Sequence, residues 1–411
     1  MAGFVADGGS APALFPASLA AADADGSLDP AGVSAVDPAA GSAETVLASA
    51  GAAEDGPEAN TTESIDEHAR VHRTTEIPLP WRRHCDQAPK ARLPPARGLA
   101  IVSSVQSSTA LHVDLADLPG QARALLRLRG PDTERFLQGL LSADISTMKP
   151  GQSTPGALLT VKGKIISEVI VLRDEEGFAL ALPAEIHEAV TGDLDRHIIM
   201  DDVTLHPSTE DDFSLVWGAH GELPSSGGAT VFTAIHPAPG LLVVGSAEDR
   251  RAVVQGIPAA DTETFTRHRV ATGTPAWGHE IRPDFFPPEV GFVAAVSYDK
   301  GCYRGQEPLS RIHSRGQVNR VMARVRARTA PADPALNAES RPSAGVWTSW
   351  APCDGGGVEG LAILHRSVAA PGQQLRAGEL AVEVTSGPLG DDPGIRKASN
   401  APATVKLGGR R

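Results

Sequence analysis

Short apolar runs alternate with polar turns from about residue 112 onward. Most are too short for helices. We predict strands at 124–128, 157–160, 165–172, 178–182, 203–205, 213–217, 231–234 and 241–244. Because the runs 157–160 and 165–172 flank the turn Lys162-Gly163-Lys164, we expect them to pair with each other.

Helices are predicted where start signals precede apolar residues at helical spacing. The tripeptide Gly130-Pro131-Asp132 places Pro in the first turn of one helix, and a second helix carries an i, i+4 stripe from Ile186 to Ile198. A third covers 261–272 and stops at Gly273. Strands with helices packed on one side predict an α+β domain over residues 109–320.

The pattern changes after residue 320. Short strands are predicted at 321–325, 345–349, 360–364 and 380–384, divided by loops rich in Pro and Gly. This spacing is typical of a small β-barrel, which we place at 321–390. Residues 391–411 are predicted to be disordered from their composition.

Composition sets the N-terminal segment apart. Residues 1–69 contain no Lys or Arg but twelve Asp or Glu, with few large apolar residues. Such a segment cannot bury enough apolar surface to offset its chain entropy, so residues 1–108 are predicted to be a disordered acidic tail and linker. The whole chain carries a net charge of −13 and this segment −12, which leaves −1 for the rest.

The sequence favours a cytoplasmic location. The acidic tail lacks the basic start of a secretory signal and the Arg content of a mitochondrial presequence, and no apolar run reaches the roughly 18 residues of a membrane span. The three cysteines, Cys85, Cys302 and Cys353, are far apart, which disfavours a disulfide scaffold. Without a C-x-x-C pair, no metal site is predicted.

The strongest chemical signal is the octet Lys300-Gly301-Cys302-Tyr303-Arg304-Gly305-Gln306-Glu307. It places a thiol between two cations in a turn that opens a helix, which favours the thiolate. We therefore take Cys302 and Lys300 as candidate catalytic residues. A small buried packing residue is the structural alternative for Cys302, and His313 is either a helix-face residue or a proton partner of the thiol.

This octet closely resembles the signature K-G-C-[YF]-x-G-Q-E of the YgfZ-type folate-binding proteins, relatives of the glycine-cleavage T-protein, an aminomethyltransferase. All seven specified positions are filled. Other segments follow the family's order and spacing over about 110–385, namely 130–132, 136–138, 162–165, 269–275 with Gly278 and Glu280, 288–289 and 345–349.

The resemblance implies an aminomethyltransferase-like folate-binding fold, with lobes around a central channel and a C-terminal barrel closing one side. It implies tetrahydrofolate or another reduced folate as cofactor, and a role in the upkeep of iron–sulfur proteins. Some members are described as affecting tRNA modification. On this resemblance the candidate folate-binding residues include Tyr303, Gln306, Glu307 and Glu280.

Positive charge suggests further ligand contacts. From Lys300 to Arg328 there are eight cations against one acid, Glu307. Arg311 and Arg315 are candidates for the carboxylates of a folate tail, although a nucleic-acid backbone would serve equally well. Because both share a helix face with Glu307, an ion pair there could be wholly structural. Aromatic residues, at 4%, are too few for base stacking, so nucleic acid is an unlikely partner.

One position departs from the T-protein pattern. Enzymes that move the aminomethyl carbon carry an Asp pair in the segment where this chain has Ser167-Glu168. A carboxylate one methylene longer moves its oxygens by more than the roughly 0.5 Å that catalytic placement tolerates. We therefore favour a solvent-facing strand residue for Glu168, with a catalytic role as the alternative.

These observations favour a monomeric or weakly associating, cytoplasmic folate-binding protein without membrane contact. Its expected partners are iron–sulfur client proteins or assembly factors. The alternative is a folate-dependent aminomethyltransferase, and a weaker one is an RNA-binding protein linked to tRNA modification. The folate-binding role in iron–sulfur upkeep requires Cys302 and tolerates loss of Glu168. The aminomethyltransferase activity requires a carboxylate near the folate.

Overall fold

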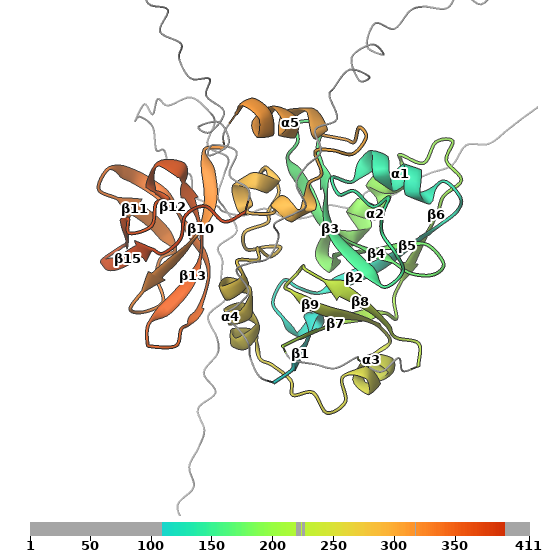
Figure 1. Cartoon of the computed structure of the whole chain (residues 1–411), viewed down its shortest axis with the longest axis horizontal. Coiled ribbons are helices and arrows are strands. Elements are labelled where there is room, and N and C mark those ends of the chain that lie inside the picture. The colour runs from blue at the N-terminus through green and yellow to red at the C-terminus, as the bar shows by residue number, and fades with distance from the viewer. Residues whose placement is uncertain (1–108, 219–222, 224–226, 317, 391–411) are drawn as a thin grey trace, which may run out of the picture. The chain divides into compact units, whose positions relative to one another are not determined.

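The computed structural model describes residues 109–218, 223, 227–316 and 318–390, which all lie in one unit of the chain, Ala91–Arg411 (Figure 1). The predicted disordered segments 1–108 and 391–411 fall outside the described residues.

A nine-stranded sheet has the strand order β1-β7-β9-β8-β3-β4-β5-β2-β6. Its strands are β1 (Leu111–Asp114), β2 (Arg123–Arg129), β3 (Gln152–Leu159), β4 (Ile165–Arg173), β5 (Phe178–Pro183), β6 (Thr204–Ser208), β7 (Asp212–Trp217), β8 (Thr230–Ala234) and β9 (Gly240–Gly245). β3 and β4 form the predicted antiparallel hairpin. The pairing of β3 with β8 is parallel, through Gln152 and Thr233, and joins the two halves of the sheet.

The central strands bury both faces, which explains their continuous apolar runs. Alternate residues of β4 enter different cores: Ile170 packs with Phe213 of β7, and Val169 packs with Phe136 of α1. One face of this half of the sheet is thus covered by helices and the other by the strands of the second half. This arrangement confirms the predicted α+β class.

The helices are α1 (Thr133–Leu140), α2 (His187–Asp195), α3 (Ala247–Val253), α4 (Thr262–Thr272) and α5 (Gln306–Arg315). α4 begins and ends as predicted, because the Asp261 side chain accepts a hydrogen bond from the Thr264 N–H at 2.8 Å and Gly273 adopts a left-handed conformation. α2 is shorter than the predicted stripe, since Ile186 precedes it and Ile198 follows it. β1 and α3 were not predicted.

Short 3-10 helices fill several connections, at Leu115–Asp117, Ala184–Ile186, Pro287–Val290, Val293–Ala295 and Arg366–Val368. The described part of the chain has no helix that is both long and apolar enough to cross a membrane.

A closed barrel with the strand order β10-β13-β12-β11-β14-β15 follows α5, as predicted. Its strands are β10 (Arg320–Ala327), β11 (Ala335–Ala338), β12 (Arg341–Pro352), β13 (Val358–His365), β14 (Gln374–Ala377) and β15 (Leu380–Val384). Trp347 of β12 is buried in its core. Next to Trp347 the register with β13 shifts by one residue, so that Thr348 has no direct partner.

Candidate functional site

The candidate thiol lies in the loop before α5. The side chain of Cys302 is exposed, and the first residue of α5 is Gln306, four residues further on. The helix cap Gly305 has φ +81°, and a Cβ there would lie 2.5 Å from the carbonyl oxygen of Thr160. Only glycine fits this close approach. The N–H groups at the helix start therefore lie about one turn beyond Cys302, which is further than the sequence indicated.

Lys300 anchors the loop to the end of α1. Its ammonium donates to the carbonyl oxygens of Leu141, at 2.9 Å, and Ala143, at 2.5 Å. The same group lies 5.2 Å from the centre of the Tyr303 ring. Burial lowers the pKa of Lys300 to about 8, against an opposing effect of Asp144.

Arg304 anchors the other side of the loop to α2. Its guanidinium donates to the Asp193 carboxylate at 2.8 Å and lies 3.2 Å from the Nε2 atom of His197. Its backbone N–H donates to the carbonyl oxygen of Gly139, at 3.0 Å. Both cations beside Cys302 thus hold the loop in place. Within the described part of the chain the thiol itself makes no hydrogen bond.

Tyr303 and Gln306 stabilise the same loop from within. The Tyr303 side chain is buried, and its hydroxyl donates to the carbonyl oxygen of Ser297 at 3.1 Å. Burial raises the pKa of Tyr303. The Gln306 amide donates to the carbonyl oxygen of Lys300 at 3.4 Å. Their roles in folate binding stay predictions.

On α5, Glu307 and Arg311 form the ion pair that the sequence offered as a structural alternative. The Arg311 guanidinium lies 2.5 Å from the Glu307 carboxylate, and both side chains are about three-quarters exposed. Exposed pairs of this kind contribute at most about 1 kcal/mol, so Arg311 remains available to a ligand. The side chain of Arg315 lies outside the described residues.

Glu280 is fully buried between α4 and the barrel. One carboxylate oxygen accepts hydrogen bonds from Arg269 and the Ala276 N–H, at 2.9 and 3.0 Å, and the other accepts from Thr348 and Ser349, both at 2.6 Å. Successive strand residues normally point to opposite faces, and the register shift in β12 brings both hydroxyls to Glu280. This carboxylate joins two parts of the fold, and its predicted contact with folate stays a prediction.

Glu168 corrects the sequence interpretation, because it is fully buried in β4 and not solvent-facing. Its carboxylate contacts the guanidinium of Arg123 and lies 2.8 Å from the Nε2 atom of His236. Burial alone would raise the pKa of Glu168, but the charge of Arg123 and the hydrogen bond with His236 outweigh it and lower the pKa from its ordinary value of 4.5.

The cluster of Glu168, Arg123 and His236 was not predicted from the sequence. Arg123 comes from β2 and also donates to the side chain of Gln121, at 3.3 Å, and His236 comes from the turn before β9. A signal was present, since Glu168 is the one acid within the apolar run 165–172. An acid inside a strand buried on both faces must have charged or hydrogen-bonding partners.

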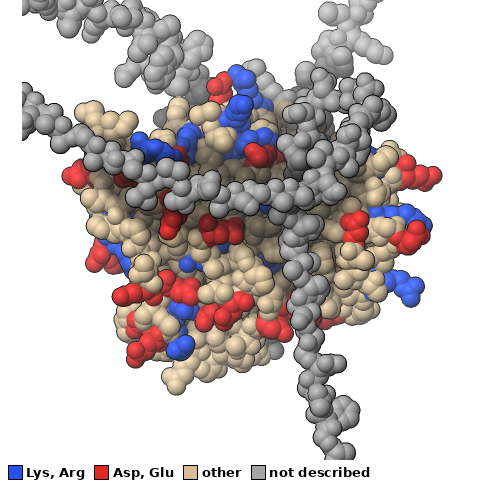
Figure 2. Space-filling model, turned by 180° about the vertical axis from the view of Figure 1, so that it is seen from behind, with Lys and Arg blue, Asp and Glu red and all other residues tan. Residues whose placement is uncertain are grey.

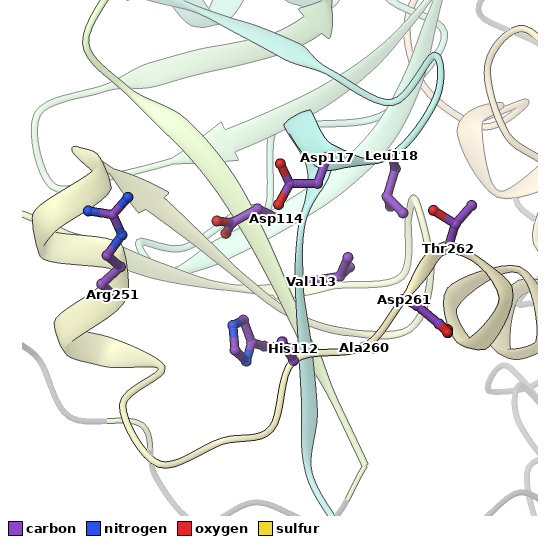
Figure 3. A pocket seen from close by; sticks show the side chains of 10 residues that line it. His112, Val113, Asp114, Asp117, Leu118, Arg251, Ala260, Asp261 and Thr262 are labelled. Atoms are coloured by element: carbon purple, nitrogen blue, oxygen red, sulfur yellow. The ribbon is translucent and has the colours of Figure 1, made fainter. Parts of the chain in front are cut away.

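A pocket of about 390 Å³ lies elsewhere, where β1 passes the start of α4 (Figure 3). Its lining includes His112, Asp117, Arg251 and Thr262. None of the site residues predicted from the sequence lines it.

The chain is similar in sequence to several known proteins. No family model matches the chain. Proteins named tRNA-modifying protein YgfZ, from Pectobacterium carotovorum and from Escherichia coli O157:H7, are each 27% identical to it over 224 residues, covering 48% of this chain and 66% and 68% of theirs. The chain thus spans about two thirds of the length of these curated relatives.

The chain is thus similar in sequence to the YgfZ proteins. The resemblance to the YgfZ-type proteins is thereby confirmed. A solved structure, the glycine cleavage system aminomethyltransferase T from Bartonella henselae, matches with a TM-score of 0.57 and 18% identity over 68% of this chain and 86% of that one. At that identity the match shows the fold alone, and it confirms the predicted aminomethyltransferase-like architecture.

Proposed function

We propose that this chain binds a reduced folate and uses Cys302 to support the assembly or repair of iron–sulfur clusters in client enzymes. The observation that carries this proposal is the exposure of Cys302 within the octet, in a chain that is similar to the YgfZ proteins. The two cations beside the thiol, Lys300 and Arg304, bind other parts of the fold and hold the loop, while the thiol itself is exposed. A thiol presented in this way suits contact with a partner protein or with a cluster being transferred as cargo.

The donor chemistry of the site fits a folate. A folate carries carboxylates on its glutamate tail, and Arg311 offers an exposed guanidinium whose pair with Glu307 is weak enough to exchange for a ligand carboxylate. A bound tetrahydrofolate would supply ring nitrogens able to carry a one-carbon unit. Tyr303, Gln306 and Glu280 would contribute by fixing the shape of the surrounding loops.

The burial of Glu168 makes aminomethyl transfer the less favoured alternative. An acid that protonates a folate nitrogen must lie within hydrogen-bond reach of it. Glu168 has no exposed surface and is already engaged by Arg123 and His236. Using it as a catalytic acid would require breaking a buried ion pair, which is costly.

A link to tRNA is a second candidate, favoured by the name tRNA-modifying protein that the relatives carry. Direct binding of RNA would call for a surface dominated by positive charge. On the face in Figure 2, however, Asp and Glu side chains are interspersed with Lys and Arg. We therefore place the role in tRNA modification behind the folate proposal. RNA binding would be recognised by an affinity that falls steeply with salt.

The test combines a titration with a complementation assay. Calorimetric titration with tetrahydrofolate is expected to give micromolar or tighter binding to the wild type and to Cys302→Ala, and about tenfold weaker binding to Arg311→Ala. In a strain lacking its YgfZ protein, Cys302→Ala should fail to restore the activity of iron–sulfur enzymes. If the folded protein binds no reduced folate, the proposed folate binding is refuted. Full complementation by Cys302→Ala would refute the thiol role.

A further inference from the structure

Two arginines lie close to one aromatic ring near the start of the barrel. The guanidinium of Arg282 lies 5.7 Å from the centre of the Phe285 ring, and that of Arg320, the first residue of β10, lies 5.4 Å from it. The backbone at Phe285 is fixed, because its carbonyl oxygen accepts a hydrogen bond from the Ile165 N–H of β4 at 2.9 Å. Arg282 and Arg320, which are far apart in the sequence, therefore both lie near one ring whose backbone is held in place.

Neither guanidinium is in direct contact with an acidic side chain among the described residues, although the charge of Glu280 acts on Arg282. Neither forms an ion pair or a side-chain hydrogen bond there, and the Nε–H of Arg282 is buried without a partner. Arg282 is partly buried, whereas Arg320 is exposed. Other partly buried arginines differ from Arg282, since Arg304 pairs with Asp193 and Arg324 donates to the carbonyl oxygens of Val270 and Ala271. A half-buried guanidinium without any acceptor is unusual, because a lost acceptor costs more for a charged donor than for a neutral one.

The surroundings are positive. Burial and the charges of Arg341 and Arg320 lower the pKa of His365, which lies opposite Arg320 in the pairing of β10 with β13.

Three acids lie close in the sequence, but none forms an ion pair with either arginine. Glu280 is engaged by four donors of its own, and Glu289 accepts from the Phe286 N–H and pairs with Lys164 at 3.5 Å. Asp284 forms no ion pair within the described part of the chain.

We propose that Arg282 and Arg320, held on the Phe285 ring, form a subsite for an oxyanion, a carboxylate or a phosphate. Stacking on an aromatic ring fixes the plane of a guanidinium while leaving its N–H edge free to donate. An acceptor with several oxygens, unlike a single carbonyl, can accept hydrogen bonds from two such edges at once. The carboxylate source would be the glutamate chain of a folate, and the phosphate source would be inorganic phosphate or a phosphorylated small molecule.

The carboxylate reading rests on the proposed folate binding, and the phosphate reading does not. In the first arm, calorimetry compares tetrahydrofolate bearing one glutamate with tetrahydrofolate bearing three. The wild type should bind the triglutamate about tenfold more tightly, and this preference should disappear in Arg282→Gln and in Arg320→Gln. In the second arm, inorganic phosphate at constant ionic strength should raise the Tm of the wild type and of neither variant.

The control is Arg376→Gln, which removes an exposed cation of β14 and should change neither arm. Arg320 is exposed, so its variant is expected to fold even if Arg282→Gln does not. Arg282→Lys then serves as a milder change that keeps the charge and removes the fork. If folate fails to bind while the phosphate effect depends on both arginines, the proposed function fails and the subsite stands. If neither ligand depends on Arg282 and Arg320, the subsite is refuted.

Discussion

At Glu168 the folded protein holds a fully buried carboxylate, which pairs with Arg123 and lies within hydrogen-bond distance of His236. Removing one partner from such a cluster leaves the other charge buried and uncompensated, which costs far more than the loss of a surface pair. Cys302 shows the opposite situation, with an exposed side chain whose neighbours bind elsewhere. These two residues have separate effects, the first on stability and the second on reactivity.

Replacing Glu168 by Gln is expected to lower the free energy of unfolding by about 3 to 5 kcal/mol, because the charge of Arg123 stays buried without its counter-charge. Urea unfolding followed by circular dichroism measures this change. Glu307→Gln, which affects the exposed pair with Arg311, is the control and should cost less than about 1 kcal/mol. Equal effects of the two changes would contradict the buried ion pair.

The same carboxylate predicts a dependence on pH. Since the pKa of Glu168 is lower in the folded protein than its ordinary value of 4.5, the unfolded chain takes up the proton first as the pH falls. Its contribution to stability is complete above about pH 4.5 and is lost as the pH falls through the folded-state pKa. Tm measured from pH 7 to pH 3 should therefore fall less steeply in Glu168→Gln than in the wild type. Parallel curves would be the contrary result.

Cys302 and Cys353 are expected to differ in their rates of alkylation. Cys302 is exposed, whereas Cys353 is half-buried and its thiol donates to the carbonyl oxygen of Gly356 at 3.3 Å. We expect iodoacetamide at pH 7 to modify Cys302 first, as read by peptide mass analysis after short exposures. Cys302→Ala identifies its peptide. Faster labelling at Cys353 would show that the loop shields the thiol in solution.

At the scale of elements, the loop before α5 depends on Lys300 and Arg304, which attach it to α1 and α2. Most strands were predicted, because burial on both faces makes β5 continuously apolar and β4 apolar except at Ser167, Glu168 and Arg173. The short strands β1, β11 and β14 were missed. The contacts of Lys300 and Arg304 were not predicted, since the sequence does not show which carbonyl or carboxylate a cation beside a thiol will bind. The register shift in β12 also leaves no periodic signal, although it is what directs Thr348 and Ser349 to Glu280.

Replacing Lys300 by Met should loosen this loop without unfolding the sheet. The change removes two hydrogen bonds from a charged donor, and we expect roughly 1 to 3 kcal/mol of local stability to be lost. Hydrogen exchange should accelerate at the Arg304 and Ser297 amides, which now donate to Gly139 and Ser142. Lys149→Met, at an exposed position, is the control. Unchanged exchange at both amides would mean that Arg304 alone holds the loop.

For the whole molecule, the order of sheet, α5 and barrel followed from the patterns and from the resemblance to the aminomethyltransferase fold, because both depend on sequence order. How the barrel is attached did not follow, since it depends on contacts between residues far apart in the chain. Glu280 receives donors from α4 and from β12, and Arg324 of β10 donates to the last carbonyls of α4, at 2.8 and 2.6 Å from Val270 and Ala271. These polar contacts surround an apolar interface that includes Met322 of the barrel.

Replacing Glu280 by Gln is expected to uncouple the barrel from the sheet. The amide retains one acceptor oxygen for the donors that reach the carboxylate, and the charge of Arg269 remains buried without a counter-charge, so we expect a loss of about 3 to 5 kcal/mol. Wild-type unfolding in urea should give coincident transitions by tryptophan fluorescence and by far-ultraviolet circular dichroism. In the variant the transitions should separate, because Trp347 and Trp350 report on the barrel. Glu339→Gln, at an exposed position of the barrel, should leave them coincident. If Glu280→Gln also unfolds in a single transition at the wild-type midpoint, the attachment of the barrel rests on the apolar interface instead.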